Sequence, residues 1–80
     1  GAPDWIIEIV SPSSERMDYV VKTFKYRTAG VREYWVIDKT LQKVTVFDFE
    51  NDNMFEYDFT QKIPVWIYDG ELEIDLSRFI

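Results

Sequence analysis

The chain has 80 residues, a formal net charge of -6, and neither Cys nor His. A chain of this length forms one domain around one small core, which excludes a multidomain enzyme or a repeat array. Hydrophobic residues make up 46% and aromatic residues 18% of the sequence, too much for a disordered chain. The absence of Cys and His excludes disulfides, zinc fingers and His-dependent nucleophile systems.

The N-terminal part of the sequence predicts a strand followed by a helix. Residues 5–10 (WIIEIV) form a short β-branched apolar run, typical of a strand buried on both faces in the middle of a sheet. Residues 15–29 carry apolar side chains at helical spacing, which predicts a helix with one apolar stripe, made of Met17, Val20, Val21, Phe24 and Thr28. Ser13 or Ser14 is expected to cap its start and Gly30 to follow its end.

The remaining sequence predicts a sheet that continues in antiparallel fashion. Residues 33–38 form a second apolar strand, and the order strand, helix, strand predicts a parallel crossover. Residues 44–49 and 55–59 alternate around an Asn- and Asp-rich turn, which predicts a hairpin with one wet side. Residues 64–68 predict another short strand, with a turn at Asp69-Gly70, a return strand over residues 71–74, and Asp75 capping a final turn.

Charge is distributed unevenly along the chain. The segment from residue 16 to residue 32 holds five bases against the single acid Asp18, a balance of +4, so the rest of the chain carries -10. The bases are Arg16, Lys22, Lys25, Arg27 and Arg32. A solvated helix face explains this pattern, and a phosphate-facing surface is the alternative. The overall acidity argues against a generic nucleic-acid binder.

Glu8 is the residue that least fits its surroundings in the sequence. It shares a strand face with Ile6 and Val10 inside an otherwise apolar run. A buried carboxylate is kept only where it is paired, binds a metal or takes part in chemistry. The alternative is an edge strand whose polar face meets water, or a glutamate held by a base.

Lys22 is the predicted partner of Glu8. It lies four residues after Asp18 and four before Tyr26, so the three share one side of the helix. A simple surface pair between Asp18 and Lys22 is one reading; a lysine that reaches the Glu8 carboxylate is the other. Asp4 lies on the same strand face as Glu8 but roughly 13 Å away, too far for both to hold one ion directly.

Without Cys and His, the side chains available for catalysis or metal binding are carboxylates, lysines and tyrosines. Carboxylate oxygens favour Mg²⁺ or Mn²⁺, and three glycines provide no glycine-rich phosphate loop. No apolar run approaches the length of a membrane span and no signal peptide is recognisable, so we expect a cytoplasmic protein without membrane contact.

These residues resemble a known family. The string at residues 1–13 (GAPDWIIEIVSPS), then Asp18, Lys22 and Tyr26, and then residues 30–38 (GVREYWVID) resemble the Uma2 family, also called DUF820. Residues 71–76 (ELEIDL) resemble its C-terminus. The family is grouped with nucleases of the PD-(D/E)xK superfamily. The resemblance implies an α/β (α+β) fold with a restriction-endonuclease-like mixed sheet, one crossover helix and a C-terminal antiparallel hairpin layer.

The resemblance also implies roles for individual residues. Glu8 would be the metal-binding acid, Val10 would stand where the usual lysine is found, and Lys22 would be that lysine supplied from the helix. The reaction would be metal-dependent hydrolysis of phosphodiester bonds in DNA, with Mg²⁺ or Mn²⁺ as cofactor and Glu8 and Lys22 as catalytic residues.

Residues 1–80 would then form a single domain that corresponds to the C-terminal part of a Uma2-like domain. The upstream part of the family normally supplies a further catalytic acid, so the resemblance does not decide whether this chain is an enzyme. The alternative is a non-catalytic dimerisation or interaction module, with a homodimer or other association through exposed strand edges. A third reading is a basic helix that only grips nucleic acid, through Lys25 and Arg27.

Overall fold

The computed structural model describes residues 1–11 and 16–80, with the backbone alone at residues 16–19. The predicted caps Ser13 and Ser14 lie outside the described residues. The elements in chain order are β1 (Trp5–Val10), α1 (Arg16–Ala29), β2 (Glu33–Asp38), β3 (Lys43–Asp48), β4 (Asn53–Asp58), β5 (Lys62–Pro64), the 3-10 helix η1 (Trp66–Tyr68), β6 (Glu73–Asp75) and the 3-10 helix η2 (Ser77–Phe79).

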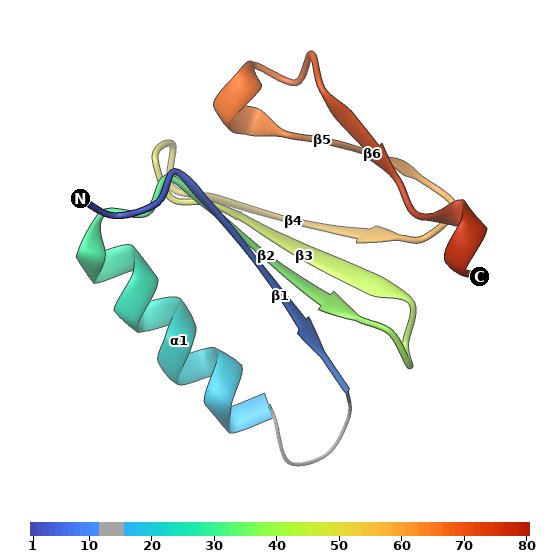
Figure 1. Cartoon of the computed structure of the whole chain (residues 1–80), viewed down its shortest axis with the longest axis horizontal. Helices are drawn as coiled ribbons and strands as arrows, with labels where there is room; N and C mark the ends of the chain where they lie inside the picture. Colours follow the sequence, from blue (N-terminus) through green and yellow to red (C-terminus); the bar gives the residue numbers. More distant parts are fainter. Residues whose placement is uncertain (12–15) are drawn as a thin grey trace.

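Four strands form a mixed sheet in the order β1-β2-β3-β4. β1 and β2 are parallel, while β2-β3 and β3-β4 are antiparallel, as the sequence predicts. Figure 1 shows three layers, with α1 on one face of this sheet and the β5-β6 pair on the other. The predicted fold class, a mixed sheet with one crossover helix and a C-terminal hairpin layer, is therefore confirmed.

The core lies between the large sheet and the β5-β6 layer. The alternating side chains of the central strands β2 and β3 point into it, and Phe59, Ile63 and Val65 cover them from the other side. The buried cluster consists of Trp35, Ile37, Val44, Val46, Phe59, Ile63 and Val65. These apolar side chains are the main source of stability, since each one removed from water contributes roughly 1.5–3 kcal/mol.

β1 differs from its prediction. It is the edge strand of the sheet, not a central one, and the side chains of Ile7 and Ile9 are 45% and 60% exposed. An apolar run of this kind occurs both in central strands and in edge strands with an exposed apolar face. Sequence alone does not distinguish the two, because the position of a strand in the sheet depends on its neighbours.

α1 also differs from its prediction, because the described apolar side chains of its predicted stripe face outward. Val20, Val21 and Phe24 are 55%, 62% and 75% exposed, while Lys22 and Tyr26 are half-buried against the sheet. The sheet face below the helix presents the polar Glu8 and the aromatic ring of Tyr34, which suit these two side chains better than small apolar ones. The helix ends at Ala29 and is followed, as predicted, by Gly30, whose φ of 91° is accessible to glycine and strained for other residues.

The C-terminal layer confirms the return strand and corrects one boundary. β5 pairs with β6 in antiparallel fashion, but β5 ends at Pro64, and residues 66–68 form η1 in place of the predicted strand. Asp69 at φ 56° and Gly70 at φ 76° then reverse the chain. Asp75 accepts a hydrogen bond from the Ser77 N–H at 2.9 Å, at the predicted final turn. In the part of the chain that the structure describes, no helix is long and apolar enough to cross a membrane.

Candidate functional site

The site forms where β1 passes under α1. Glu8 stands on the helix side of β1, opposite Val36 of β2, and its side chain is 26% exposed. The phenol hydroxyl of Tyr26 donates a hydrogen bond to Glu8 Oε1 at 3.0 Å. The carboxylate is therefore neither in the core nor free in solvent. It keeps contact with water while one of its oxygens is held in place.

Lys22 lies one helical turn before Tyr26 and pairs with the same carboxylate oxygen. Its Nζ is 3.6 Å from Glu8 Oε1, and its side chain is 38% exposed. Residues four apart on a helix share a face, which is why both side chains reach the same point on β1. The predicted contact between Glu8 and Lys22 is confirmed.

Tyr26 acts as a positioning residue for this pair. Its ring packs edge-on against the ring of the buried Tyr34 in β2, with centroids 5.1 Å apart. Tyr34 in turn stacks on Phe47 and Phe49. The aromatic series fixes the rotation of α1 over the sheet, so the Lys22 ammonium and the Tyr26 hydroxyl are both directed at Glu8.

The other acids of the N-terminal region lie elsewhere. Asp4, at the start of β1, is 3.7 Å from Arg32, which also donates a hydrogen bond to Glu50 at 2.9 Å. These two carboxylates raise the pKa of the Arg32 guanidinium, and the hydrogen bond that Arg32 donates to Glu50 is the largest cause. The side chain of Asp18 lies outside the described residues. Asp4 therefore belongs to a surface ion pair with Arg32, which the sequence did not predict, and it does not join Glu8.

The donor set allows a limited metal site. Among residues 1–11 and 20–80, no three acidic side chains gather at one point. Mg²⁺ keeps several waters in proteins and commonly binds one or two carboxylates together with phosphate oxygens of a substrate. Glu8 fits that chemistry as a single carboxylate ligand, with its Oε1 already shared by Lys22 and Tyr26.

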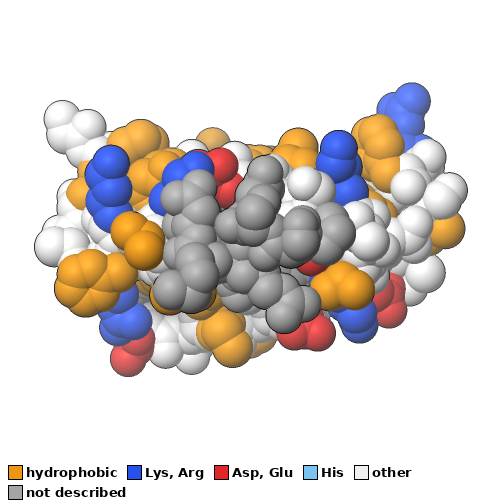
Figure 2. All heavy atoms as spheres, turned by 90° about the horizontal axis from the view of Figure 1, so that it is seen from below, with side chains coloured by type: hydrophobic (Ala, Val, Ile, Leu, Met, Phe, Trp, Pro, Cys, Tyr) orange, Lys and Arg blue, Asp and Glu red, His pale blue; other side chains and the backbone are white. Residues whose placement is uncertain are grey.

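The basic surface predicted for the helix is partly neutralised by the hairpin. Arg27 forms an ion pair with Asp52 at 2.5 Å and lies over the ring of Phe49, and Arg32 is engaged by Glu50. On the face seen in Figure 2, Lys and Arg side chains form separate groups between apolar and acidic ones. This arrangement weakens the reading of α1 as a plain phosphate-gripping helix.

Sequence reasoning missed a second unusual glutamate. Glu33, the first residue of β2, is completely buried under the C-terminal layer. It accepts hydrogen bonds from Trp35 Nε1 at 2.7 Å and from the Ile67 backbone N–H at 2.8 Å. The pKa of the nearby Tyr57 hydroxyl is raised by burial and then by the charge of Glu33. The signal was available, since Glu33 shares a strand face with Trp35 and Ile37.

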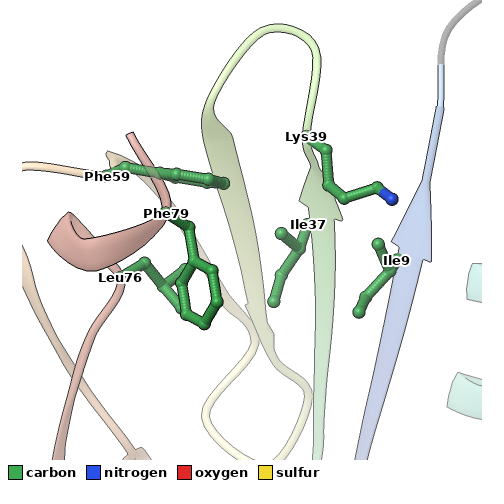
Figure 3. A pocket seen from close by; sticks show the side chains of 6 residues that line it. All are labelled: Ile9, Ile37, Lys39, Phe59, Leu76 and Phe79. Atoms are coloured by element: carbon green, nitrogen blue, oxygen red, sulfur yellow. The ribbon is translucent and has the colours of Figure 1, made fainter.

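A cavity of about 280 Å³ opens on the other side of β1 and β2. It is lined by Ile9, Ile37, Lys39, Phe59, Leu76 and Phe79. In Figure 3 the Lys39 side chain reaches from the end of β2 toward Ile9 on β1. The cavity is apolar apart from this ammonium, and the sheet separates it from Glu8.

Comparisons with known proteins agree with this architecture. A search of solved structures finds a crystal structure described as a "putative nuclease belonging to DUF820" from Anabaena variabilis ATCC 29413, with 26% sequence identity and a TM-score of 0.77. The match covers 98% of this chain and 44% of that chain, so the present chain spans less than half the length of its solved neighbour. No curated protein matches the sequence.

The architecture is thus that of a restriction-endonuclease-like nuclease fold. The family model of Uma2, described as "Putative restriction endonuclease", matches residues 1–76. The chain belongs to the Uma2 family.

Proposed function

We propose that this chain carries part of the active site of a metal-dependent DNA endonuclease that hydrolyses phosphodiester bonds. The supporting observation is the Glu8-Lys22 pair, 3.6 Å apart, on a strand and the helix that follows it. Family membership and the nuclease-like fold of the solved neighbour support the reaction class. Because the chain spans 44% of that neighbour, the activity of a complete protein is part of the proposal.

The chemistry assigns a separate task to each side chain. A bound Mg²⁺ or Mn²⁺ would polarise the scissile phosphate and lower the pKa of a bound water. Glu8 would hold the ion through its carboxylate. Lys22, half-exposed beside it, would orient the attacking water or stabilise the negative charge that develops on the phosphate oxygens. Tyr26 would hold Glu8 in place by its 3.0 Å hydrogen bond.

The first test is Mn²⁺ binding by calorimetry on the 80-residue chain. We expect binding by the unmodified chain and its loss in Glu8→Gln, because the amide lacks the negative charge of the carboxylate. Glu56→Gln is a matched control, since Glu56 also faces a lysine, Lys43, at 3.9 Å. Equal affinity in the unmodified chain and in Glu8→Gln would contradict the role of Glu8.

The second test is cleavage of plasmid and linear duplex DNA in the presence of Mg²⁺ or Mn²⁺. We expect Lys22→Met to lower the rate by about 10²-fold or more, the usual effect of removing a charge that stabilises a transition state. Lys43→Met, which removes the lysine of the control pair, should leave the rate unchanged. Unchanged cleavage in Lys22→Met would contradict the assignment of Lys22.

A non-catalytic interaction module is the second candidate function. It is favoured by the exposed apolar side chains of β1 and α1, among them Ile9, Val21 and Phe24. The two candidates are alternatives: association of the chain without any Mg²⁺ or Mn²⁺ affinity would support the non-catalytic module, and Mn²⁺ binding that depends on Glu8 would support the nuclease.

A further inference from the structure

We propose that the guanidinium groups of Arg27 and Arg32 form a binding site for the phosphates of a DNA backbone, and that Glu50 and Asp52 occupy this site in the free protein. These two carboxylates belong to the turn between β3 and β4, and DNA would displace them on binding. The inference rests on the proposed function only in naming DNA as the ligand, and its test requires neither metal nor cleavage.

Both arginines lie at one end of the molecule and are engaged by the same turn. Arg27 belongs to the last turn of α1, and Arg32 directly precedes β2. Arg27 Nη2 is 2.5 Å from Asp52 Oδ1, and Arg32 Nε donates a hydrogen bond to Glu50 Oε2 at 2.9 Å. In Figure 1 the turn between β3 and β4 lies near the C-terminal end of α1. One turn thus presents a carboxylate to each guanidinium.

The spacing of these carboxylates matches that of backbone phosphates. Glu50 and Asp52 are two residues apart, so their Cα atoms are separated by at most about 7 Å. A DNA strand carries one phosphate for about every 3.4 Å of helix axis, so phosphates of one strand supply two negative charges over the same length. A guanidinium binds carboxylate and phosphate oxygens with the same paired N–H donors. The turn therefore offers the arginines the groups that a DNA strand would offer.

Other contacts hold the arginines in place beside the turn. The backbone carbonyl of Arg32 accepts hydrogen bonds from the N–H groups of Phe49 at 2.9 Å and Glu50 at 3.3 Å. The Arg27 guanidinium lies over the ring of Phe49, 5.9 Å from its centroid. Because these contacts do not involve the two carboxylates, the site keeps its position when the ion pairs are broken.

The ion pairs are exposed enough to be exchanged. The side chains of Arg27 and Asp52 are 58% and 77% exposed, and those of Arg32 and Glu50 are 40% and 51% exposed. Exposed ion pairs contribute little to stability, so replacing a carboxylate by a phosphate costs little. Arg32 has a second acid, Asp4, at 3.7 Å. We therefore expect Arg27 to contribute more to phosphate binding than Arg32.

The position of this site agrees with that of the proposed active site. Arg27 directly follows Tyr26, whose hydroxyl binds Glu8. Asp4, which pairs with Arg32, lies on the same strand face as Glu8, roughly 13 Å away along β1. This length corresponds to about four phosphates along the axis of one DNA strand. A short stretch of DNA can therefore extend from the arginines to Glu8.

Fluorescence anisotropy with a labelled duplex of about 12 base pairs, roughly one helical turn, tests the masking in the absence of divalent metal. We expect the double variant Glu50→Gln/Asp52→Asn to bind at least about fivefold more tightly than the unmodified chain, because two competing ion pairs are removed. Glu71→Gln/Glu73→Gln is the matched control, since it removes the same charge from exposed positions of the C-terminal layer. Its gain should stay below about twofold, with circular dichroism showing that all variants are folded. Equal gains in the two double variants would overturn the masking.

The salt dependence of the same binding tests the arginines. In the Glu50→Gln/Asp52→Asn background, we expect Arg27→Gln and Arg32→Gln each to weaken binding and to reduce the slope of log K against log salt by about 1. Arg78→Gln is the control, because Arg78 also lies over an aromatic ring, at 5.6 Å, and its loss should change neither quantity.

Two results would overturn the phosphate site. They are an unchanged salt slope in both arginine variants and the absence of duplex binding by the Glu50→Gln/Asp52→Asn variant. The outcome is separate from that of the nuclease tests, because no metal is present. Duplex binding through the arginines together with Mn²⁺ affinity that is independent of Glu8 would contradict the nuclease proposal alone.

Discussion

Glu8 and Glu33 are glutamates on neighbouring strands of one sheet, and their surroundings differ in almost every respect. Glu33 faces the C-terminal layer, is completely buried, and accepts hydrogen bonds from the neutral N–H groups of Trp35 and Ile67. Glu8 faces α1, keeps 26% of its side chain exposed, and is paired with a lysine. One carboxylate ties two layers together, and the other stays within reach of solvent.

This difference separates a structural carboxylate from one that is available for chemistry. Both oxygens of Glu33 accept hydrogen bonds from donors fixed in the fold, and the residue has no exposed surface. At Glu8, the contacts with Tyr26 and Lys22 involve the same oxygen, Oε1. A carboxylate that must bind an ion or a substrate requires such partial exposure, whereas one that joins two layers requires full burial.

The largest expected effect comes from removing Glu33. Glu33→Ala leaves the buried Trp35 Nε1–H and the partly buried Ile67 N–H without an acceptor, at up to about 1–3 kcal/mol each. We expect the melting temperature to fall by about 10 °C or more, since 1 kcal/mol corresponds to about 4–8 °C in a domain of this size. Glu8→Ala should cost less than about 1 kcal/mol, as expected for a partly exposed ion pair. Thermal unfolding followed by circular dichroism measures both variants. Equal decreases in melting temperature would show that Glu8 and Glu33 contribute equally to stability.

A second pair of substitutions compares the buried core with the exposed strand β1. Ile63 is completely buried in the core, and Ile9 is 60% exposed on β1. We expect Ile63→Ala to lower the free energy of unfolding by about 2–5 kcal/mol. Ile9→Ala should lower it by no more than about 0.5 kcal/mol in the monomer. Urea denaturation at low protein concentration measures both values. A large decrease in the free energy of unfolding for Ile9→Ala would show that Ile9 is covered in solution even at low protein concentration.

The smallest effect concerns exposed carboxylates held by their own turns. Hydrogen bonds from the Thr60 hydroxyl and backbone N–H lower the pKa of Asp58, and those of Ser77 do the same for Asp75. A pKa lowered by folding adds stability above the pKa of the unfolded chain, and this stability is lost as pH falls through the folded value. We expect NMR titration to show Thr60→Ala raising the pKa of Asp58 alone, and Ser77→Ala raising that of Asp75 alone. A shift of both groups in either variant would point to long-range charge effects.

The fold was predictable from sequence wherever a local pattern determines an element. The apolar run of β2, the alternation of β3 and β4, and Gly30 after α1 all led to the observed elements. The edge position of β1 and the outward turn of Phe24 were not predictable, because both depend on what lies beside the element and not on its own residues. At residues 66–68, the turn required after Pro64 overrode the β propensity of Trp-Ile-Tyr.

The site was predictable in part, for a related reason. A glutamate inside an apolar strand and a lysine on the next helix led to the contact that the structure shows. The same parity argument was not applied to Glu33, the first residue of its strand. Its burial results from η1, more than 30 positions later in the chain, whose Ile67 N–H it binds. The roles of Glu8, Lys22 and the metal remain predictions for the experiments above.

The connectivity of the sheet has a consequence for the order in which the molecule assembles. β2, β3 and β4 follow one another through short turns, so their contacts close quickly, whereas β1 must find β2 across the whole of α1. The central meander is thus expected to form first, and β1 is expected to dock late and open early. The Glu8-Lys22 pair lies on this last-formed unit, so we expect this contact and the amide-exchange protection of β1 to be lost together, below the temperature at which the meander unfolds.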